Sequence, residues 1–147
     1  MSNVSTLTTH KLDVLKLPLQ GIQLIEASAG TGKTWTLAAL YVRLILGHGW
    51  KWQGLMPPQI LVMTFTEAAT AELRDRIRSR LAQAAQFFRG QVQDADDFLR
   101  DLQATLGTEH NAAHAARLEE AAQWMDEAAI YTIHSWSSRM LRQHAFD

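Results

Sequence analysis

The stretch Ala27-Ser-Ala-Gly-Thr-Gly-Lys-Thr34 has the residue types and spacing of a phosphate-binding loop. Gly30 and Gly32 allow the backbone to turn tightly, so that its N–H groups can approach phosphate oxygens. Lys33 can then reach the β and γ phosphates of a nucleotide, and the Thr34 hydroxyl can bind Mg²⁺. The stretch therefore predicts a site for ATP and Mg²⁺, with Lys33 and Thr34 nearest to any chemistry.

The residues on either side of this loop predict the elements that must position it. The apolar run 22–26 is typical of a buried strand, and residues 33–46 have the apolar spacing of a helix. A strand, a glycine loop and a helix form the context that the motif requires, and the helix N-terminus adds free N–H donors. The alternative is a Gly- and Thr-rich turn that binds no ligand, and the order of strand, glycine loop and helix disfavours it. We expect Trp35 and Tyr41 to lie in the core.

Composition and charge limit the classes of protein to which the chain can belong. With 147 residues, 47% of them hydrophobic and 20% charged, it is long enough for one soluble domain with a core. The formal net charge of −1 gives no overall attraction to nucleic acid, so any DNA contact must come from a local patch. The chain has no cysteine, which excludes disulfides and thiolate metal sites. We recognise neither a secretory signal nor an apolar run of membrane-spanning length, and we expect a cytoplasmic protein.

Two further strands are predicted, and each leads into a helix. Residues 59–64 and 128–133 are short apolar runs, followed by helical patterns over residues 67–88 and 134–145. Strands that alternate with helices predict an α/β fold with a parallel sheet. The residues expected to pack in the core are Leu73, Ile77, Leu81, Ala84 and Phe88 from the first helix, and Ile133, Trp136, Met140 and Leu141 from the second.

Arginines lie on both flanks of the core stripe of the 67–88 helix, at Arg74, Arg76, Arg78 and Arg80. We interpret these flanks as a solvated face with ion pairs, in which Glu72 can pair with Arg76 at i, i+4. Such pairs keep a long helix soluble without assigning it a function.

Two alanine-rich amphipathic stretches, 94–106 and 111–125, predict a helical insertion between the strand–helix units. Asn111 is expected to cap the second of these helices. His110 and His114 have the i, i+4 spacing of metal ligands, but no Glu completes a zinc-binding motif, and we treat both as surface residues.

The pair Asp126-Glu127 has the composition of the acidic motif that activates water in phosphate-binding-loop enzymes. That motif follows an apolar strand, which places its Asp beside Mg²⁺. Here the pair precedes the run 128–133. We therefore reject it as that motif.

Three blocks together resemble a known family: Ala27 to Thr34, then Thr64-Phe-Thr-Glu-Ala-Ala-Thr-Ala-Glu-Leu73, then Tyr131-Thr-Ile-His-Ser-Trp136. This combination is similar to superfamily 1A DNA helicases of the UvrD/Rep type, which accept Ala at the first position of the loop. Residues 17–34 and 125–129 look most like the RecB-like helicase–nucleases. The resemblance covers nearly the whole chain and implies a RecA-like P-loop NTPase fold.

The resemblance implies a role for each matching residue. The side chain of Gln20 would read adenine, although a surface turn residue is an equal alternative at this position. Single-stranded DNA would contact Thr64, Phe65, Thr66, Thr132 and His134, which follow predicted parallel strands, where open α/β sheets bind ligands. Packing in the core is the alternative for Phe65 and His134. The triphosphate would be held by Ala27, Ser28, Ala29, Gly30, Thr31, Gly32, Lys33 and Thr34, with Mg²⁺ on Thr34.

The expected organisation is a tail over residues 1–16, a P-loop core over 17–90, the helical insertion over 91–127 and a continuation of the core over 128–147. The continuation stops before the acidic Mg²⁺ motif of the family, so we expect a truncated or incomplete product. Such a piece would lack the second RecA-like domain with its arginine fingers, and we expect negligible ATP hydrolysis and no unwinding from it.

The implied parent is an ATP-dependent helicase and exonuclease of double-strand-break repair and recombination, with partner subunits in a heterotrimer. A partial sheet with open apolar surface also predicts self-association, or a helical rearrangement that covers the gap. The alternatives are a module that binds nucleotide or a partner without turnover, and a P-loop NTPase of another class, such as a small-molecule kinase.

Overall fold

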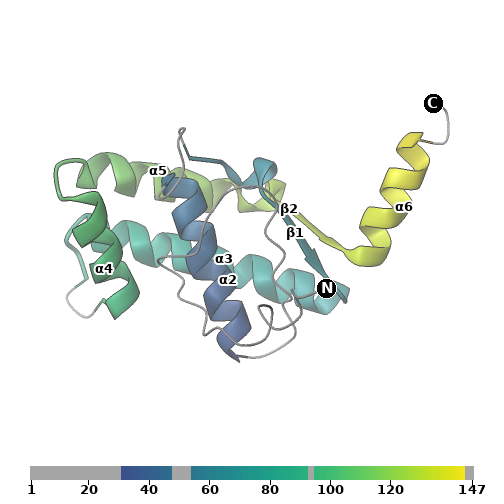
Figure 1. Cartoon of the computed structure of the whole chain (residues 1–147), viewed down its shortest axis with the longest axis horizontal. Coiled ribbons are helices and arrows are strands. Elements are labelled where there is room, and N and C mark those ends of the chain that lie inside the picture. Colours follow the sequence, from purple (N-terminus) through teal and green to yellow (C-terminus); the bar gives the residue numbers. More distant parts are fainter. Residues whose placement is uncertain (1–30, 48–53, 93–94, 145–147) are drawn as a thin grey trace, which may run out of the picture.

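A computed structural model describes residues 31–47, 54–92 and 95–144 of the chain, and Gln20 and the strand expected over 22–26 lie outside these ranges. The described part contains helices and a parallel sheet, as expected of an α/β protein (Figure 1). None of its helices combines the length and hydropathy needed to cross a bilayer. In chain order the elements are α2 (Thr31–Leu46), the 3-10 helix η1 (Pro57–Gln59), β1 (Leu61–Thr64), α3 (Glu67–Phe88), α4 (Asp97–Leu106), α5 (Asn111–Gln123), the 3-10 helix η2 (Trp124–Glu127), β2 (Ala129–Thr132) and α6 (Ile133–His144).

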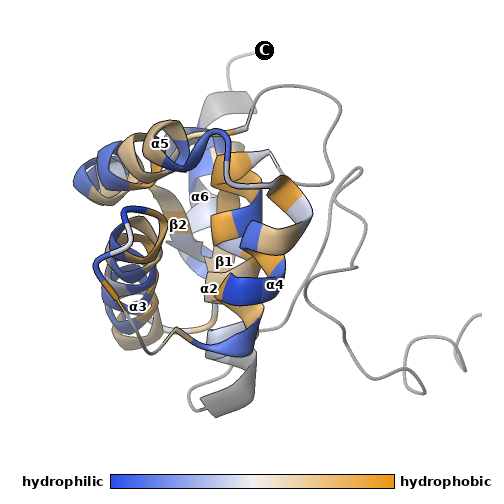
Figure 2. Ribbon diagram, turned by 90° about the vertical axis from the view of Figure 1, so that its left-hand side faces the viewer, coloured by the Kyte–Doolittle hydropathy of each residue, from blue (hydrophilic) through white to orange (hydrophobic). Residues whose placement is uncertain are grey.

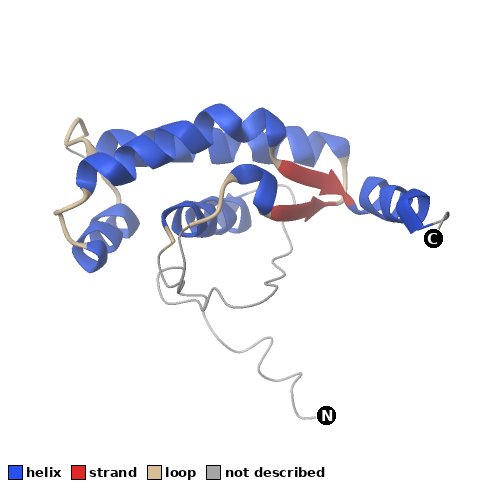
Figure 3. Ribbon diagram, turned by 90° about the horizontal axis from the view of Figure 1, so that it is seen from above, coloured by secondary structure: helices blue, strands red, loops and turns tan. Residues whose placement is uncertain are grey.

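The two strands β1 and β2 pair in parallel, so that both run toward the start of α6 (Figure 3). Their register places Leu61 beside Ala129 at one end and Thr64 beside Thr132 at the other. One face of the pair is buried, and α3 packs against both strands. The side chains of the buried face are Val62, Thr64, Ile130 and Thr132. The two strands predicted over 59–64 and 128–133 are confirmed with slightly shorter ends.

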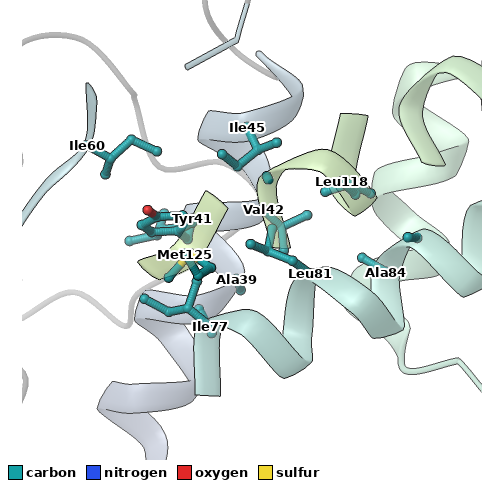
Figure 4. Close-up of a cluster of buried hydrophobic side chains, with 14 of the residues drawn as sticks. Ala39, Tyr41, Val42, Ile45, Ile60, Ile77, Leu81, Ala84, Leu118 and Met125 are labelled. Carbon is teal, nitrogen blue, oxygen red and sulfur yellow. The ribbon is translucent and has the colours of Figure 1, made fainter. Parts of the chain in front are cut away.

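The main core lies where α2, α3, α5 and η2 meet (Figure 4). The predicted apolar stripe of α3 is confirmed, since all five of its residues are buried. Tyr41 is 1% exposed, as expected, and its hydroxyl has no hydrogen-bond partner among the described residues. Burial raises the pKa of this phenol, because the charged form would be poorly solvated. Other core side chains in this view are Val42 and Ile45 from α2, Leu118 from α5 and Met125 from η2.

Arg76 and Arg78 of α3 agree with the predicted solvated, ion-paired face, whereas Arg80 departs from it. Arg80 is buried and pairs with Asp96 at 2.6 Å. Arg78 pairs with Asp75 on its own helix and with Asp126 on η2. The proposed pair between Glu72 and Arg76 is not formed in the described part of the chain. The periodicity of α3 predicts its core face. The ion-pair partners of Arg78 and Arg80, however, include residues that are distant in sequence, Asp126 and Asp96.

Three predicted core residues are instead exposed. Leu141 and Ile133 of α6 are 73% and 43% exposed, because α6 extends away from the other helices and contacts mainly the two strands (Figure 1). Trp136 and Met140 of the same helix are half-buried. Trp35 of α2 is 44% exposed and lies at the rim of the core. Helical spacing predicts which residues share a face, and the tertiary partner decides whether that face is covered.

The helices α4 and α5 form in the segment predicted to be a helical insertion, and the ribbon of α4 carries both strongly hydrophilic and strongly hydrophobic residues (Figure 2). The predicted cap of α5 is wrong, because Asn111 is its first helical residue and His110 occupies the capping position without a side-chain hydrogen bond. His114 is half-buried against Phe88 rather than on the surface, and burial lowers its pKa. Within the described residues, no group of three potential metal ligands is present.

Gly54 lies directly against the C-terminal end of α2. A Cβ atom at this position would come within 2.0 Å of the Ile45 carbonyl oxygen and 2.8 Å of the Gly47 nitrogen. The next residue fixes the same approach, because the Leu55 amide donates to the Leu44 carbonyl at 2.9 Å. The absence of a side chain at Gly54 is therefore what lets this segment close over α2.

We predict that Gly54→Ala lowers the free energy of unfolding by about 1–3 kcal/mol, because backbone must shift to admit the new methyl group. Gly90→Asn is the matched control: Gly90 has a φ of 75° and an added Cβ would meet nothing within 4 Å. Asn tolerates this conformation better than other residues, so the control costs less than about 1 kcal/mol. Urea unfolding of both variants measures the difference, and equal losses would contradict the steric argument.

Candidate functional site

The ends of the two parallel strands bring together the residues predicted to contact DNA. Thr64 and Thr132 are the last residues of β1 and β2 and are direct partners in the register. Phe65 and Thr66 follow β1, and His134 lies in the first turn of α6. Residues from two distant parts of the sequence therefore meet at one edge of the sheet, where open α/β sheets bind their ligands.

The two strand-end threonines are buried and bond to protein groups. The Thr64 hydroxyl shares a 2.5 Å hydrogen bond with the Thr70 hydroxyl and donates to the Thr66 carbonyl at 3.2 Å. The Thr132 hydroxyl accepts from the Ser135 amide at 3.0 Å, which caps the start of α6. In this geometry both side chains fix the turns that leave the strands.

The next residues along the chain face solvent. Phe65 is 62% exposed, and Thr66 and His134 are exposed as well. Packing in the core, the alternative for Phe65 and His134, is therefore excluded. An exposed aromatic ring beside exposed hydroxyl and imidazole groups offers a surface on which a base can stack and phosphate oxygens can accept hydrogen bonds.

Two helices begin at this edge, and their N-termini favour anions. Thr66 caps α3 by accepting from the Ala69 amide at 3.0 Å, and a hydroxyl that accepts in this way still has its O–H to donate. The Ser135 hydroxyl donates to the Glu67 carboxylate at 3.3 Å, which ties the start of α6 to the start of α3. The charge of Glu67 offsets part of the positive potential, so an approaching phosphate meets mainly dipoles and hydroxyls.

The predicted nucleotide loop is described only from Thr31 onward. The helix α2 begins at Thr31, two residues before the predicted start, and ends at Leu46 as predicted. Its first turn, Thr31-Gly-Lys-Thr34, contains no acidic residue, which leaves a helix N-terminus suited to an anion. Thr34 is half-buried in that turn. The residues Gln20, Ala27, Ser28, Ala29 and Gly30 lie outside the described ranges, as do the side chains of Thr31 and Lys33.

Asp126 lies far from the position that an Mg²⁺-binding aspartate needs. It sits in η2, before β2 begins, whereas the ligand edge lies after β2 ends. Its carboxylate accepts a 2.6 Å hydrogen bond from Arg78. This placement agrees with the rejection of Asp126-Glu127 as the acidic motif.

Sequence reasoning missed Thr70 as part of this edge. The residue continues the spacing of the buried stripe of α3, which runs on through Leu73 and Ile77, and it is 5% exposed. A hydroxyl at an apolar position needs a partner, and that requirement is the signal that could have identified it. Its partner is Thr64, so Thr70 holds the first strand end against α3.

Comparison with known proteins gives consistent matches over most of the chain. Residues 7–147 match the family model described as the UvrD/REP helicase N-terminal domain. The RecBCD enzyme subunit RecB of Escherichia coli (strain K12) is 48% identical over 139 residues, which are 92% of this chain and 12% of that protein. The subunit of the same name from Haemophilus influenzae is 47% identical over 147 residues, 94% of this chain and 12% of that protein.

A more distant relative, the RecBCD enzyme subunit RecB of Mycobacterium tuberculosis (strain ATCC 25618 / H37Rv), is 32% identical over 127 residues. The alignment covers 86% of this chain and 11% of that protein. The chain thus spans only 12% of the length of the two more similar relatives. The similarity is therefore to a small part of a far larger protein.

We predict that Thr66→Ala lowers the free energy of unfolding by about 1 kcal/mol, because the Ala69 amide loses its cap. Thr66→Asp is the matched control for stability, since an Asp side chain caps a helix at least as well as Thr. Thermal unfolding followed by circular dichroism compares the two variants. Equal destabilisation by Ala and Asp would show that the cap at Thr66 contributes nothing.

Proposed function

The chain belongs to the UvrD/REP helicase N-terminal domain family, and from this membership we propose that it binds ATP and single-stranded DNA as the N-terminal part of a RecB-like, ATP-dependent DNA helicase and exonuclease. We place the parent protein in the cytoplasm, in repair and recombination at double-strand breaks. The observation that carries the proposal is the shared edge of β1 and β2, where the residues of two separate motifs meet.

The DNA-binding part of the proposal rests on the exposed groups at that edge. Phe65 provides a stacking surface, and Thr66 and His134 provide polar contacts to phosphate. The buried side chains of Thr64 and Thr132 fix the turns that carry Phe65, Thr66 and His134. Their hydroxyls bond to the Thr70 hydroxyl and the Ser135 amide. Contacts of this kind carry no information about base identity, which suits a protein that moves along any sequence.

The nucleotide-binding part rests on the loop motif and on α2. The helix starts inside the motif. Its first turn contains no Asp or Glu, and the N–H groups of this turn can donate hydrogen bonds to phosphate oxygens. Lys33 would contact the β and γ phosphates, Thr34 would hold Mg²⁺, and Gln20 would bond to adenine. Bound Mg²⁺ would neutralise charge on the phosphates.

We predict that Phe65→Ala weakens binding of a single-stranded oligonucleotide by about 1–3 kcal/mol, the range found when a stacking aromatic is removed. The ring is exposed, so thermal stability should change little. Trp124→Ala is the matched control, because Trp124 is 48% exposed but lies before β2, at the other end of the strand. Fluorescence anisotropy at two salt concentrations tests both variants, and binding that is insensitive to Phe65 would contradict the assignment.

We predict that these 147 residues bind ATP through Lys33 but turn it over negligibly, with or without DNA. No aspartate directly follows either of the two described strands at the ligand edge, and Asp126 precedes β2 and bonds to Arg78. Lys33→Ala should abolish ATP binding by calorimetry. Robust DNA-stimulated phosphate release by the unaltered chain would contradict the second half of the prediction.

Two alternatives to this function are separated by the same experiments. A nucleotide- or partner-binding module without DNA affinity would bind ATP and ignore the change at Phe65. A P-loop NTPase of another class would turn over ATP with a small-molecule acceptor.

For the parent protein, the proposal includes partner subunits in a heterotrimer.

Self-association of this chain through α6 is also part of the proposal, because Ile133 and Leu141 are exposed apolar side chains on one projecting helix. We predict that the molar mass in light scattering rises with protein concentration. Leu141→Glu should reduce that rise, whereas a constant monomer mass for the unaltered chain would rule the association out.

A further inference from the structure

A cluster of four side chains joins the first turns of α2 to the helical insertion. It consists of Trp35 from α2, Arg80 from α3, and Asp96 and Phe98 at the start of α4, and we call it the Arg80 cluster. Trp35 follows Thr34 directly, so one member of the cluster is adjacent to the predicted Mg²⁺ ligand. The other members come from elements that have no part in the proposed nucleotide site.

Charge and ring contacts fix the guanidinium group of Arg80. Its central carbon lies 5.5 Å from the centroids of both the Trp35 and the Phe98 rings, which is within cation–π range. One terminal nitrogen donates to Asp96 at 2.6 Å and the other to Gln83 at 2.9 Å. Arg80 is only 7% exposed, whereas Asp96 and Trp35 are 37% and 44% exposed, so water has little access to these contacts from the arginine side.

Asp96 has a second role that links this contact to α4. Its other carboxylate oxygen accepts from the Leu99 amide at 3.0 Å and so caps α4. The edge-on contact between Trp35 and Phe98, at 5.9 Å between centroids, adds a direct link between α2 and α4. The start of the insertion and the start of α2 are therefore held by the same arginine.

The other end of α2 is held by the insertion as well. Arg117 of α5 donates to the carbonyls of Ile45 and Gly54, both at 2.5 Å. A cation at the C-terminal carbonyls of a helix is favourable for the helix dipole. Contacts from α3, α4 and α5 thus fix α2 near both ends.

We propose that Arg80 is a positioning residue for the first turn of α2: through Trp35 it fixes where this turn presents its backbone N–H groups, and with them Thr34, to a triphosphate. This inference rests on the proposed ATP binding. The ion pair between Arg80 and Asp96 is partly buried, with side-chain exposures of 7% and 37%, so desolvation offsets part of the attraction between its charges. Its effect lies in the defined geometry, because the hydrogen bonds from backbone N–H groups to phosphate weaken steeply when their distance and angle depart from the preferred values.

The test compares two binding activities of the full chain in one set of variants. Arg80→Met keeps apolar volume between the two rings but removes the charge. Asp96→Asn keeps the cap on α4, since Asn caps as well as Asp, but weakens the pair with Arg80. Arg100→Met is the control, because Arg100 is half-exposed on α4 and its ion pair is with Asp97 of the same helix.

We expect Arg80→Met to weaken binding of Mg-ATP about tenfold in calorimetry, and Asp96→Asn to weaken it less. Binding of single-stranded DNA should stay unchanged in both variants, because the strand edge is held by separate contacts. A purely structural role for Arg80 would lower both affinities together with the melting temperature, and that result would overturn the inference. So would unchanged ATP affinity in Arg80→Met.

The outcome for the unaltered chain separates this inference from the proposed function. If the unaltered chain does not bind ATP, the proposed function fails and the inference fails with it. If the unaltered chain binds ATP and Arg80→Met binds it equally well, only the inference fails. Arg100→Met should match the unaltered chain in both affinities.

Discussion

The parallel register of β1 and β2 is the constraint on which the candidate DNA-binding surface depends. It places Thr64 beside Thr132, and every other group at the edge takes its position from these two strand ends. A slip of β1 by one residue would turn Thr64 out of the buried face and carry Phe65 inward. The register is fixed because Val62 and Ile130 must face α3, so ordinary core burial determines the geometry of the surface.

Polar groups at this edge divide into buried ones that position and exposed ones that are available to a ligand. The hydroxyls of Thr64 and Thr70 bond to each other, and those of Thr70 and Thr132 bond to the backbone of the adjoining turns. Unsatisfied, these buried groups would cost more than their hydrogen bonds contribute, so each needs its partner. Phe65 and Thr66 are then presented on turns whose conformation is already determined, which reduces the entropy lost when a ligand binds.

Local sequence patterns predicted the helices and strands well, but they predicted the tertiary contacts between these elements poorly. The bounds of α3, the core stripe along it and the two parallel strands follow from the periodicity of apolar residues. The burial of Arg80 could not be predicted, because its partner Asp96 precedes a helix whose packing is not encoded within α3. For the same reason the exposure of Leu141 was missed, since α6 has the pattern of a covered helix but lacks a covering element among the described residues. The nucleotide loop itself stays a prediction.

The helix α3 connects the two proposed binding sites. Thr66 caps it at the DNA-binding edge, and Arg80, further along the same helix, holds the start of α2. At 1.5 Å per residue these two positions are about 21 Å apart along one continuous helix. A rigid element that touches both sites is the kind of structure through which occupancy of one can bias the other.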